Sequence, residues 1–381
     1  MFGLLQQASP ELLGHRMILM NDFQAEPETL RIAELTAMER VLRSGWYVLG
    51  NELQAFEQVW AKRCGVAHAV GVGNGMDAIE IGLRALNIGS GDEVITTPMT
   101  AFATVLAIIR AGAVPVLADV DPDTGLLDPI SVERCIGLKT KAILLVHLYG
   151  QVRAMEDWTA LCRQYGIALL EDCAQAHLAQ WNGKMAGNFG SFGAHSFYPT
   201  KNLGALGDGG ALVCNDTELA QSAATLRNYG QSVRYHHPTL GLNSRLDELQ
   251  AALLLTRLEW LEVFTERRSQ IASTYHAGIV NKAVQPLSAP IQERSHVYHL
   301  FVVLSQERDR LARHLKERGV QTLVHYPVPV HGQLPCKKLQ RDPEGLRAAE
   351  QHAAQCLSIP CHPQMSDDDI NKVIDSINAF Q

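Results

Sequence analysis

The sequence predicts an α/β protein in which helices cover both faces of a mostly parallel sheet. From about residue 67 to 214, short β-branched or apolar runs alternate with helical patterns, as in repeated strand–helix–strand units. Most of these runs are continuously apolar, which is typical of strands that are buried on both faces. We therefore expect functional residues at the carboxyl ends of the strands.

Seven strands are predicted in this region, and we expect them to form one sheet. Their ranges are 67–73, 93–97, 114–120, 142–149, 167–173, 193–197 and 209–214. A long helical stretch then begins at Ser244 and meets no proline or glycine before Gly278. It is followed by an apolar run at 297–304, a helical segment at 308–319, a Pro-rich turn at 325–333 and a terminal helix after 366–369. These later elements predict a smaller α+β domain.

The length of 381 residues is sufficient for two domains. We predict a large domain over residues 17–260 and a small C-terminal domain over residues 261–381. Residues 1–16 carry little pattern and are predicted to be an N-terminal extension. The segment MILMNDF reads as a natural beginning, which favours Met17 as the functional start.

The composition excludes several classes of protein. With 46% hydrophobic and 19% charged residues and a net charge of −7, the chain resembles neither a disordered protein nor a basic nucleic-acid binder. No stretch approaches the roughly 18 apolar residues of a membrane span, and the start lacks a signal-peptide pattern. We therefore expect a cytoplasmic protein. The eight cysteines form no CxxC pair and no HExxH occurs, so we predict reduced, buried thiols and no metal ion.

A glycine-rich turn between a predicted strand and helix is the first candidate for function. In GVGNGMDAIEIG, residues 71–82, such a turn leaves backbone N–H groups free at the start of the helix, which favours a phosphate group. Its spacing matches neither GxGxxG nor GxxxxGK[ST]. A turn that needs glycine only for its backbone conformation explains the pattern as well.

Two further segments bring a carboxylate and a lysine. Asp172 and Gln175 follow an apolar strand, where a carboxylate can hold a proton on a heterocyclic nitrogen, or can simply cap a helix. Ser196 ends a short strand, and Lys201 follows in a Pro- and Gly-rich loop. Such a lysine is often a solvated surface cation, but inside a site it can bond covalently to a carbonyl group. Together the three segments contain what a pyridoxal phosphate enzyme requires: a phosphate cradle, a carboxylate and a lysine.

Several blocks of the sequence carry a resemblance to a known family. EDCAQAH, SFYPTKNLGALGDGG, LRNYGQ, NSRLDELQAA and HYPVPVH resemble the signature blocks of the DegT/DnrJ/EryC1/StrS sugar aminotransferases. These are pyridoxal 5'-phosphate enzymes of the fold-type I, aspartate aminotransferase-like class. The resemblance runs from about Met17 to the C-terminus.

The resemblance implies a role for each matching residue. Lys201 becomes the lysine that bonds to the cofactor aldehyde, Asp172 the partner of the pyridine nitrogen, and Gln175 a residue against the ring near its hydroxyl. The phosphate is then held by Ser196, by the backbone of Gly75 and Met76, and by Asn243 of a neighbouring subunit, which implies a homodimer with shared active sites. Arg245 could meet an anionic part of a substrate, although a solvent-facing charge near a helix start explains it equally well.

Other residues near these blocks have two interpretations. His325, Tyr326 and His331 match the part of the small domain that approaches the substrate, but packing explains a His-Tyr-Pro turn equally well. His147 and Tyr149 end a predicted strand and either shape the pocket or belong to the core.

The sequence departs from the family pattern at one place. An aromatic residue that stacks on the cofactor usually follows the threonine of the TTPMT block, but Ala101 stands there and Phe102 comes next. Phe102 could replace the missing aromatic through a local shift, or another group could cover that face of the ring. Because neighbouring side chains of a strand point to opposite faces, we expect instead that Phe102 is a core residue.

The resemblance implies an aminotransferase that moves an amino group from L-glutamate to a nucleotide-linked keto sugar. The HLYGQ and HYPVPVH blocks look more like those of enzymes acting on 3-keto-6-deoxyhexoses. Two alternatives stay open: a keto-sugar dehydratase, whose known relatives lack the lysine found here at Lys201, and a non-catalytic regulatory or binding protein on the same scaffold.

Overall fold

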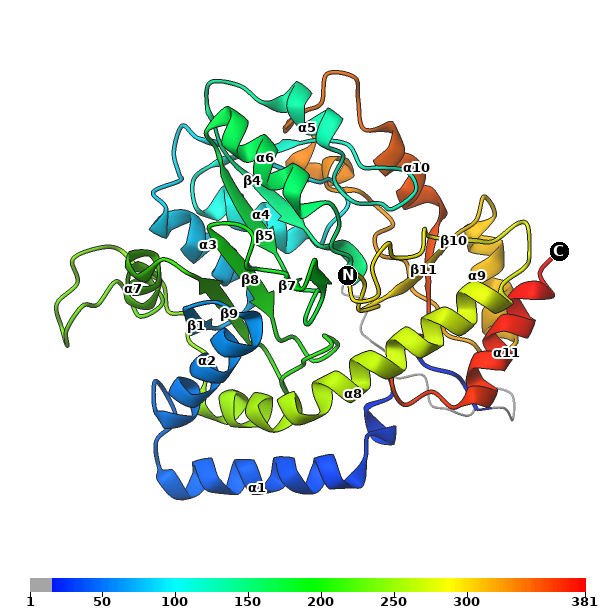
Figure 1. Ribbon diagram of the computed structural model, residues 1–381, viewed down its shortest axis with the longest axis horizontal. Helices are drawn as coiled ribbons and strands as arrows, with labels where there is room; N and C mark the ends of the chain where they lie inside the picture. Colours follow the sequence, from blue (N-terminus) through cyan, green and yellow to red (C-terminus); the bar gives the residue numbers. More distant parts are fainter. Residues whose placement is uncertain (1–15) are drawn as a thin grey trace.

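The computed structural model describes residues 16–381. Figure 1 shows a central sheet with helices on both of its faces and a smaller group of strands and helices beside it. The predicted α/β architecture is therefore confirmed. The expected N-terminal extension lies outside the described residues, apart from Arg16.

The large sheet has eight strands in the order β1-β9-β8-β5-β4-β2-β3-β12. All of its pairings are parallel except the two made by β9, so the expectation of a mostly parallel sheet is confirmed. Seven strands are those predicted from the sequence: β1 (His68–Val72), β2 (Glu93–Thr96), β3 (Val114–Leu117), β4 (Thr140–Val146), β5 (Ala168–Asp172), β8 (Phe192–Ser196) and β9 (Gly210–Cys214). The eighth, β12 (Gln340–Arg341), was not predicted, because two polar residues show no strand pattern.

Two layers of helices enclose this sheet. One face packs against α2 (Asn51–Cys64), α5 (Pro129–Cys135), α6 (Met155–Tyr165) and the first half of α8 (Glu248–Gly278). The other packs against α3 (Gly75–Ala85), α4 (Phe102–Arg110) and α7 (Thr217–Leu226). Side chains of a strand point alternately to opposite faces, so in β4 Ile143 belongs to the first core and Leu144 to the second.

Helix α8 joins the large sheet to the smaller group of elements (Figure 1). Leu254 lies in a core beneath the large sheet, whereas Ile271 and Tyr275 lie in the core of the smaller group. This confirms the long helix predicted after Ser244, while the domain boundary at residue 260 stays a prediction. Within residues 16–381, no helix combines the length and apolarity that a membrane span needs.

The smaller group consists of a three-stranded antiparallel sheet and the helices beside it. Its elements are β10 (Gln285–Pro286), β11 (Phe301–Leu304), α9 (Arg308–Glu317), β13 (Cys356–Ile359) and α11 (Asp367–Asn378). The remaining elements are η1 (Phe23–Ala25), α1 (Glu28–Ser44), η2 (Leu148–Gly150), β6 (Gln180–Trp181), β7 (Lys184–Met185), η3 (Val330–Gly332), η4 (Leu334–Cys336) and α10 (Arg347–Gln355).

A C-terminal segment, residues 340–349, is hydrogen-bonded to the edge of the large sheet. After β12, the fully buried carboxylate of Asp342 accepts a hydrogen bond from Arg134 Nε at 2.9 Å and another from Ser131 Oγ, both on α5. Asp119, after β3, accepts bonds from the backbone N–H groups of Ala348 and Ala349 at the start of α10. The segment therefore belongs physically to the large sheet.

Candidate active site

The turn between β1 and α3 lies against the end of β8. Asn74 caps α3, because its side-chain oxygen accepts a bond from the backbone N–H of Asp77 at 2.8 Å. A Cβ atom placed on Gly75 would lie only 2.7 Å from Cβ of Ser196. Glycine is therefore required for this close approach. The fold brings together Gly75, Met76 and Ser196, so the backbone N–H groups at the start of α3 and the serine hydroxyl can share one phosphate.

Asp172 is the last residue of β5, at the carboxyl end of the parallel strands. Its side chain is buried, and two donors hold the carboxylate: Thr104 Oγ1 donates to Oδ2 at 2.8 Å, and the backbone N–H of Ala174 donates to Oδ1 at 3.1 Å. A carboxylate with one donor on each oxygen has a fixed orientation and still has capacity to accept a further proton donor.

Lys201 lies in the loop after β8, where its backbone N–H donates to the carbonyl of Tyr198 at 2.8 Å. Burial of its amino group lowers the pKa of Lys201 from 10.5 to about 8, and the negative charge of Asp172 opposes part of this change. The fold therefore brings Lys201 within electrostatic reach of Asp172. A lysine with such a pKa is partly in the neutral, nucleophilic form near neutral pH.

Three histidines lie within electrostatic reach of this lysine. Burial lowers the pKa values of His177, His299 and His325, in the last case to about 4, and the positive charge of Lys201 lowers them further. Neutral imidazoles add no competing charge to the site. His177 also supports the lysine loop, because its Nδ1 accepts a bond from the backbone N–H of Leu203 at 3.1 Å.

The chemistry of these groups fits pyridoxal phosphate. The observation that tests the fit is the cradle at Gly75, which any larger residue would fill. Beside it lie an oriented carboxylate on Asp172 for a ring nitrogen and a lysine of lowered pKa for an aldehyde.

Gln175 is held between two tyrosines. Its Oε1 accepts a bond from the backbone N–H of Tyr149 at 2.6 Å, and its Nε2 donates to the hydroxyl of Tyr326 at 3.3 Å. The Tyr149 hydroxyl in turn donates to the carbonyl oxygen of His325. Tyr149 is thus a buried core residue that links Gln175 to the His325–Tyr326 turn.

Glu171, next to Asp172, anchors the end of β5 from the opposite face. Its fully buried carboxylate accepts bonds from His147 Nε2 at 2.9 Å and from the backbone N–H groups of Gly187, Phe189 and Gly190. Burial alone would raise the pKa of Glu171, but these donors outweigh it and the pKa is lowered from 4.5. Glu171, His147 and Cys173 lie close enough to hold a metal ion. Both oxygens of the Glu171 carboxylate, however, already accept hydrogen bonds from His147 and from backbone N–H groups.

Replacing Glu171 by glutamine is expected to destabilise the fold. The amide places N–H donors against backbone donors, and breaking a buried pair of this kind costs about 3–5 kcal/mol. Urea unfolding monitored by circular dichroism measures the loss. The exposed Glu133 on α5 provides the control, since Glu133→Gln should change stability by less than about 0.5 kcal/mol. Equal stability of the two variants would contradict the anchoring role.

Three other predicted residues have the following surroundings within the single chain. His331 Nε2 contacts Glu350 at 3.1 Å. Arg245 Nη1 donates to Asn228 at 2.9 Å and its guanidinium lies 5.1 Å from the ring centroid of Tyr229. Asn243 is exposed.

The expectation that Phe102 is a core residue was wrong. Phe102 is the first residue of α4, and 37% of its surface is exposed. Ala101 is the N-cap of a helix, so the alternation of side chains along a strand does not apply to Phe102. The core contact in this block comes instead from Val105, Ala107 and Ile108.

Sequence reasoning also missed two residues of the cluster, Thr104 and His299. A threonine inside an apolar helix has no distinguishing pattern, and its contact with Asp172 joins residues 68 positions apart. His299 is buried within the run at 297–304 and pairs through Nδ1 with Asn202 Oδ1 at 3.3 Å, next to Lys201.

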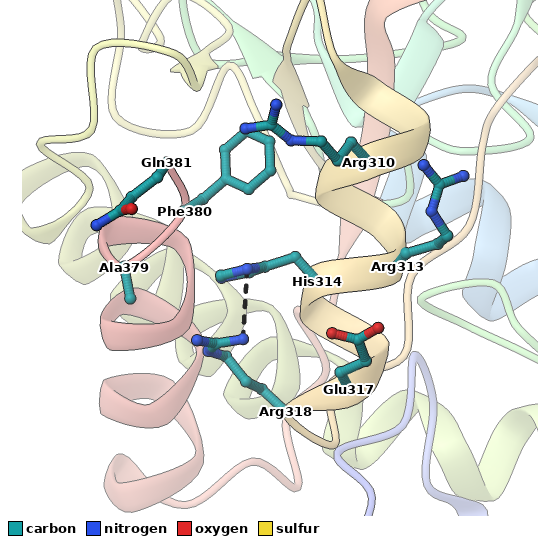
Figure 2. Close-up of a pocket in the computed structure, with 8 residues that line it drawn as sticks. All are labelled: Arg310, Arg313, His314, Glu317, Arg318, Ala379, Phe380 and Gln381. Atoms are coloured by element: carbon teal, nitrogen blue, oxygen red, sulfur yellow. Dashed lines mark hydrogen bonds between the residues drawn. The ribbon is translucent and has the colours of Figure 1, made fainter.

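A hollow of about 450 Å³ elsewhere on the molecule is not this site. Figure 2 shows it between α9 and the last residues of the chain, with three arginines and Phe380 around it. Arg310 lies over the Phe380 ring at 4.8 Å, and Arg318 Nη1 contacts His314 Nδ1 at 3.3 Å. It contains none of the residues predicted from the sequence.

Comparisons with known proteins identify the family of this chain. The sequence profile of the DegT/DnrJ/EryC1/StrS aminotransferase family matches residues 29–378. A dTDP-3-amino-3,4,6-trideoxy-alpha-D-glucose transaminase from Streptomyces venezuelae is 45% identical over 360 residues, which cover 94% of this chain and 95% of that protein. A dTDP-3-amino-3,6-dideoxy-alpha-D-galactopyranose transaminase from Aneurinibacillus thermoaerophilus is 44% identical over 344 residues, covering 90% and 94%.

A solved structure is similar over nearly its whole length. The crystal structure of S. venezuelae DesV in complex with a ketimine intermediate superimposes with a TM-score of 0.92 at 43% identity, covering 95% of this chain and 98% of that one. The chain belongs to the DegT/DnrJ/EryC1/StrS aminotransferase family and is a pyridoxal phosphate-dependent aminotransferase.

Proposed function

We propose that this enzyme transfers the amino group of L-glutamate to C3 of a dTDP-linked 3-keto-6-deoxyhexose. The observation that carries the reaction type is the combination of Lys201, Asp172 and the Gly75–Ser196 cradle in one cluster. The sugar is inferred from the names of the two relatives, which differ at C4 but share dTDP, an amino group at C3 and a deoxygenated C6.

In the proposed reaction, the cofactor supplies the reactive groups, and the protein binds the cofactor and moves the protons. Bound pyridoxal phosphate supplies an aldehyde that takes up the amino group and a ring that accepts electrons. Gly75, Met76 and Ser196 bind its phosphate, and Asp172 holds the proton on the ring nitrogen. Lys201 Nζ removes the proton from the α-carbon of glutamate and, in the second half-reaction, delivers a proton to C3 of the sugar.

Glutamate with a panel of nucleotide-linked keto sugars tests this proposal. We expect 2-oxoglutarate and a 3-amino sugar from the dTDP-linked 3-keto-6-deoxyhexose, identified by mass spectrometry and NMR. Preference for a 4-keto sugar would overturn the proposed position. Loss of water from the sugar without amination would indicate a dehydratase, and no turnover with any sugar would favour a regulatory or binding protein.

The lowered pKa of Lys201 predicts how cofactor capture depends on pH. The neutral amine is the nucleophile, so the rate at which cofactor-free protein captures pyridoxal phosphate should rise with pH and level off above about pH 8. Stopped-flow absorbance measures this rate. A rate that keeps rising up to pH 10.5, the ordinary pKa of a lysine, would contradict the assignment of Lys201 as the amine that captures the cofactor.

We also propose a homodimer in which Asn243 reaches the neighbouring active site. In support, exposed aromatic residues flank the segment around Asn243. Trp46 is 62% exposed, and the backbone of the next residue, Tyr47, accepts a bond from Glu248 N–H at 3.1 Å. Tyr229 is 47% exposed, and its backbone N–H donates to the carbonyl oxygen of Leu242, next to Asn243, at 2.7 Å. Exposed apolar groups favour association, and a second copy of the chain would cover those beside this segment.

Mixing two inactive variants tests the shared site. Asn243→Asp places a negative charge against the phosphate, and Lys201→Ala removes the base. Random mixing makes half of the dimers mixed, each with one intact site, so activity should return to about a quarter of the unsubstituted level. Each variant alone is the control. Absence of recovery, or sedimentation as a monomer, would contradict the proposal.

We further propose that the enzyme works in the cytoplasm. All eight cysteines are free thiols, and seven of them are buried, which suits a reducing compartment.

A further inference from the structure

Two buried threonine hydroxyls form a chain that ends on Asp172. Thr100 Oγ1 lies 2.7 Å from Thr104 Oγ1, and Thr104 Oγ1 lies 2.8 Å from Asp172 Oδ2. Thr100 is 4% exposed and Thr104 is 1% exposed, so water does not compete for these bonds. The chain leads from the start of α4 to the carboxylate at the end of β5.

The donor and the acceptor of each of these hydrogen bonds follow from the number of protons that each group carries. An ionised carboxylate only accepts, so the single hydroxyl proton of Thr104 is used on Asp172 Oδ2. Thr104 therefore accepts from Thr100, which must donate. Each bond polarises the next one, which strengthens the donor that Asp172 receives.

The position of Thr104 makes this contact specific. A threonine within a helix commonly bonds to a carbonyl of its own preceding turn, which satisfies the hydroxyl locally. Thr104 is the third residue of α4, and its hydroxyl contacts a carboxylate 68 residues away instead. Thr104 lies in the first turn of α4, and its hydrogen bond to Asp172 shows that this turn faces the end of β5.

We propose that Thr104 is a positioning residue for the cofactor. Its hydroxyl fixes Oδ2 of Asp172, while the N–H of Ala174 fixes Oδ1 at 3.1 Å, so the carboxylate presents one orientation to the pyridine nitrogen. Thr100 contributes indirectly, because its hydrogen bond orients the Thr104 hydroxyl. This inference rests on the role of Asp172 in the proposed function.

The test compares Thr104→Val with Thr104→Ser. Valine keeps the branched shape and loses the hydroxyl, whereas serine keeps the hydroxyl. Pyridoxal phosphate titrated into cofactor-free protein should bind about tenfold to a hundredfold more weakly to Thr104→Val, since a hydrogen bond to a charged group is lost. Thr104→Ser should bind like the unsubstituted protein. Thr100→Val should show a smaller loss in the same direction.

A spectroscopic signal separates positioning from general damage. With ¹⁵N-labelled cofactor, the NMR signal of the pyridine nitrogen should move away from the protonated position in Thr104→Val and stay unchanged in Thr104→Ser. The melting temperature of the cofactor-free variants shows whether the fold is intact, and Thr104→Ala, with the same expected loss, replaces the valine variant if that one does not fold.

Asp172→Asn in the same titration separates two kinds of failure. If Asp172→Asn weakens binding and shifts the nitrogen signal but Thr104→Val does neither, the role of Thr104 is overturned and the proposed function stands. If Asp172→Asn itself changes neither, the assignment of Asp172 is wrong and both proposals fall.

Discussion

Replacement of Lys201 by alanine is expected to abolish transamination. The variant loses the group that moves the proton at the reacting carbons, and positioned acid–base groups typically contribute about 10²–10⁴-fold to the rate. It also loses the amine that captures the cofactor. We expect kcat for 2-oxoglutarate formation from glutamate and keto sugar to fall by about a thousandfold or more.

Lys184 on β7 offers a matched control. It is an exposed lysine whose Nζ lies 5.0 Å from the ring centroid of Phe189. Lys184→Ala removes the same side chain and should keep normal turnover. Borohydride reduction of the unsubstituted protein with pyridoxal phosphate, followed by peptide mass mapping, should find the cofactor on Lys201. Retained turnover in Lys201→Ala would remove this residue from the mechanism.

Asp172→Asn is the substitution with the second largest expected effect. Asparagine keeps the size of the side chain but loses the charge that holds the proton on the ring nitrogen. A unit charge about 4 Å away is worth about 4 kcal/mol at an effective dielectric constant near 20, which corresponds to roughly a thousandfold change. We expect turnover, measured with saturating cofactor, to fall by about a hundredfold to a thousandfold.

The control for this variant is Asp368→Asn. Asp368 is exposed on α11, so its loss of charge should leave turnover unchanged. Near-normal turnover of Asp172→Asn would show that the ring nitrogen does not depend on this carboxylate.

The parts of the site that the sequence predicted are those with strong local signals. Asp172 ends a strand whose continuous apolar run marks it as buried, Lys201 and Gly75 follow two other predicted strands, and parallel strands bring their carboxyl ends to one edge. The seven strands of 67–214 were found for the same reason. Ser196 could be placed beside Gly75 only by its motif, since their contact joins two strands that are not neighbours in the sheet.

The parts that the sequence did not reveal depend on tertiary contacts. The start of α4 has no side-chain cap at Ala101, so nothing local distinguished a helix from a strand at Phe102. Thr104 and His299 act through partners far away in sequence, and their own neighbourhoods resemble any apolar core segment. β12 pairs with β3 because the next residue, Asp342, is buried beside α5. The two polar residues of β12 carry no sequence pattern that predicts this pairing.

The late strand at the edge of the sheet has a consequence for how the protein is made. Arg134 and Asp342, which hold β12 in place, are 208 residues apart, and the ribosome adds roughly 5–20 residues each second. For about 10 to 40 s of synthesis, β3 therefore has one edge without its final partner. An unpaired strand edge is a template for pairing with another chain. During that interval, nascent chains of this enzyme should therefore be most prone to pair with other chains and should most need a chaperone. We expect release from the chaperone to be free of this risk only after residue 342 has left the ribosome.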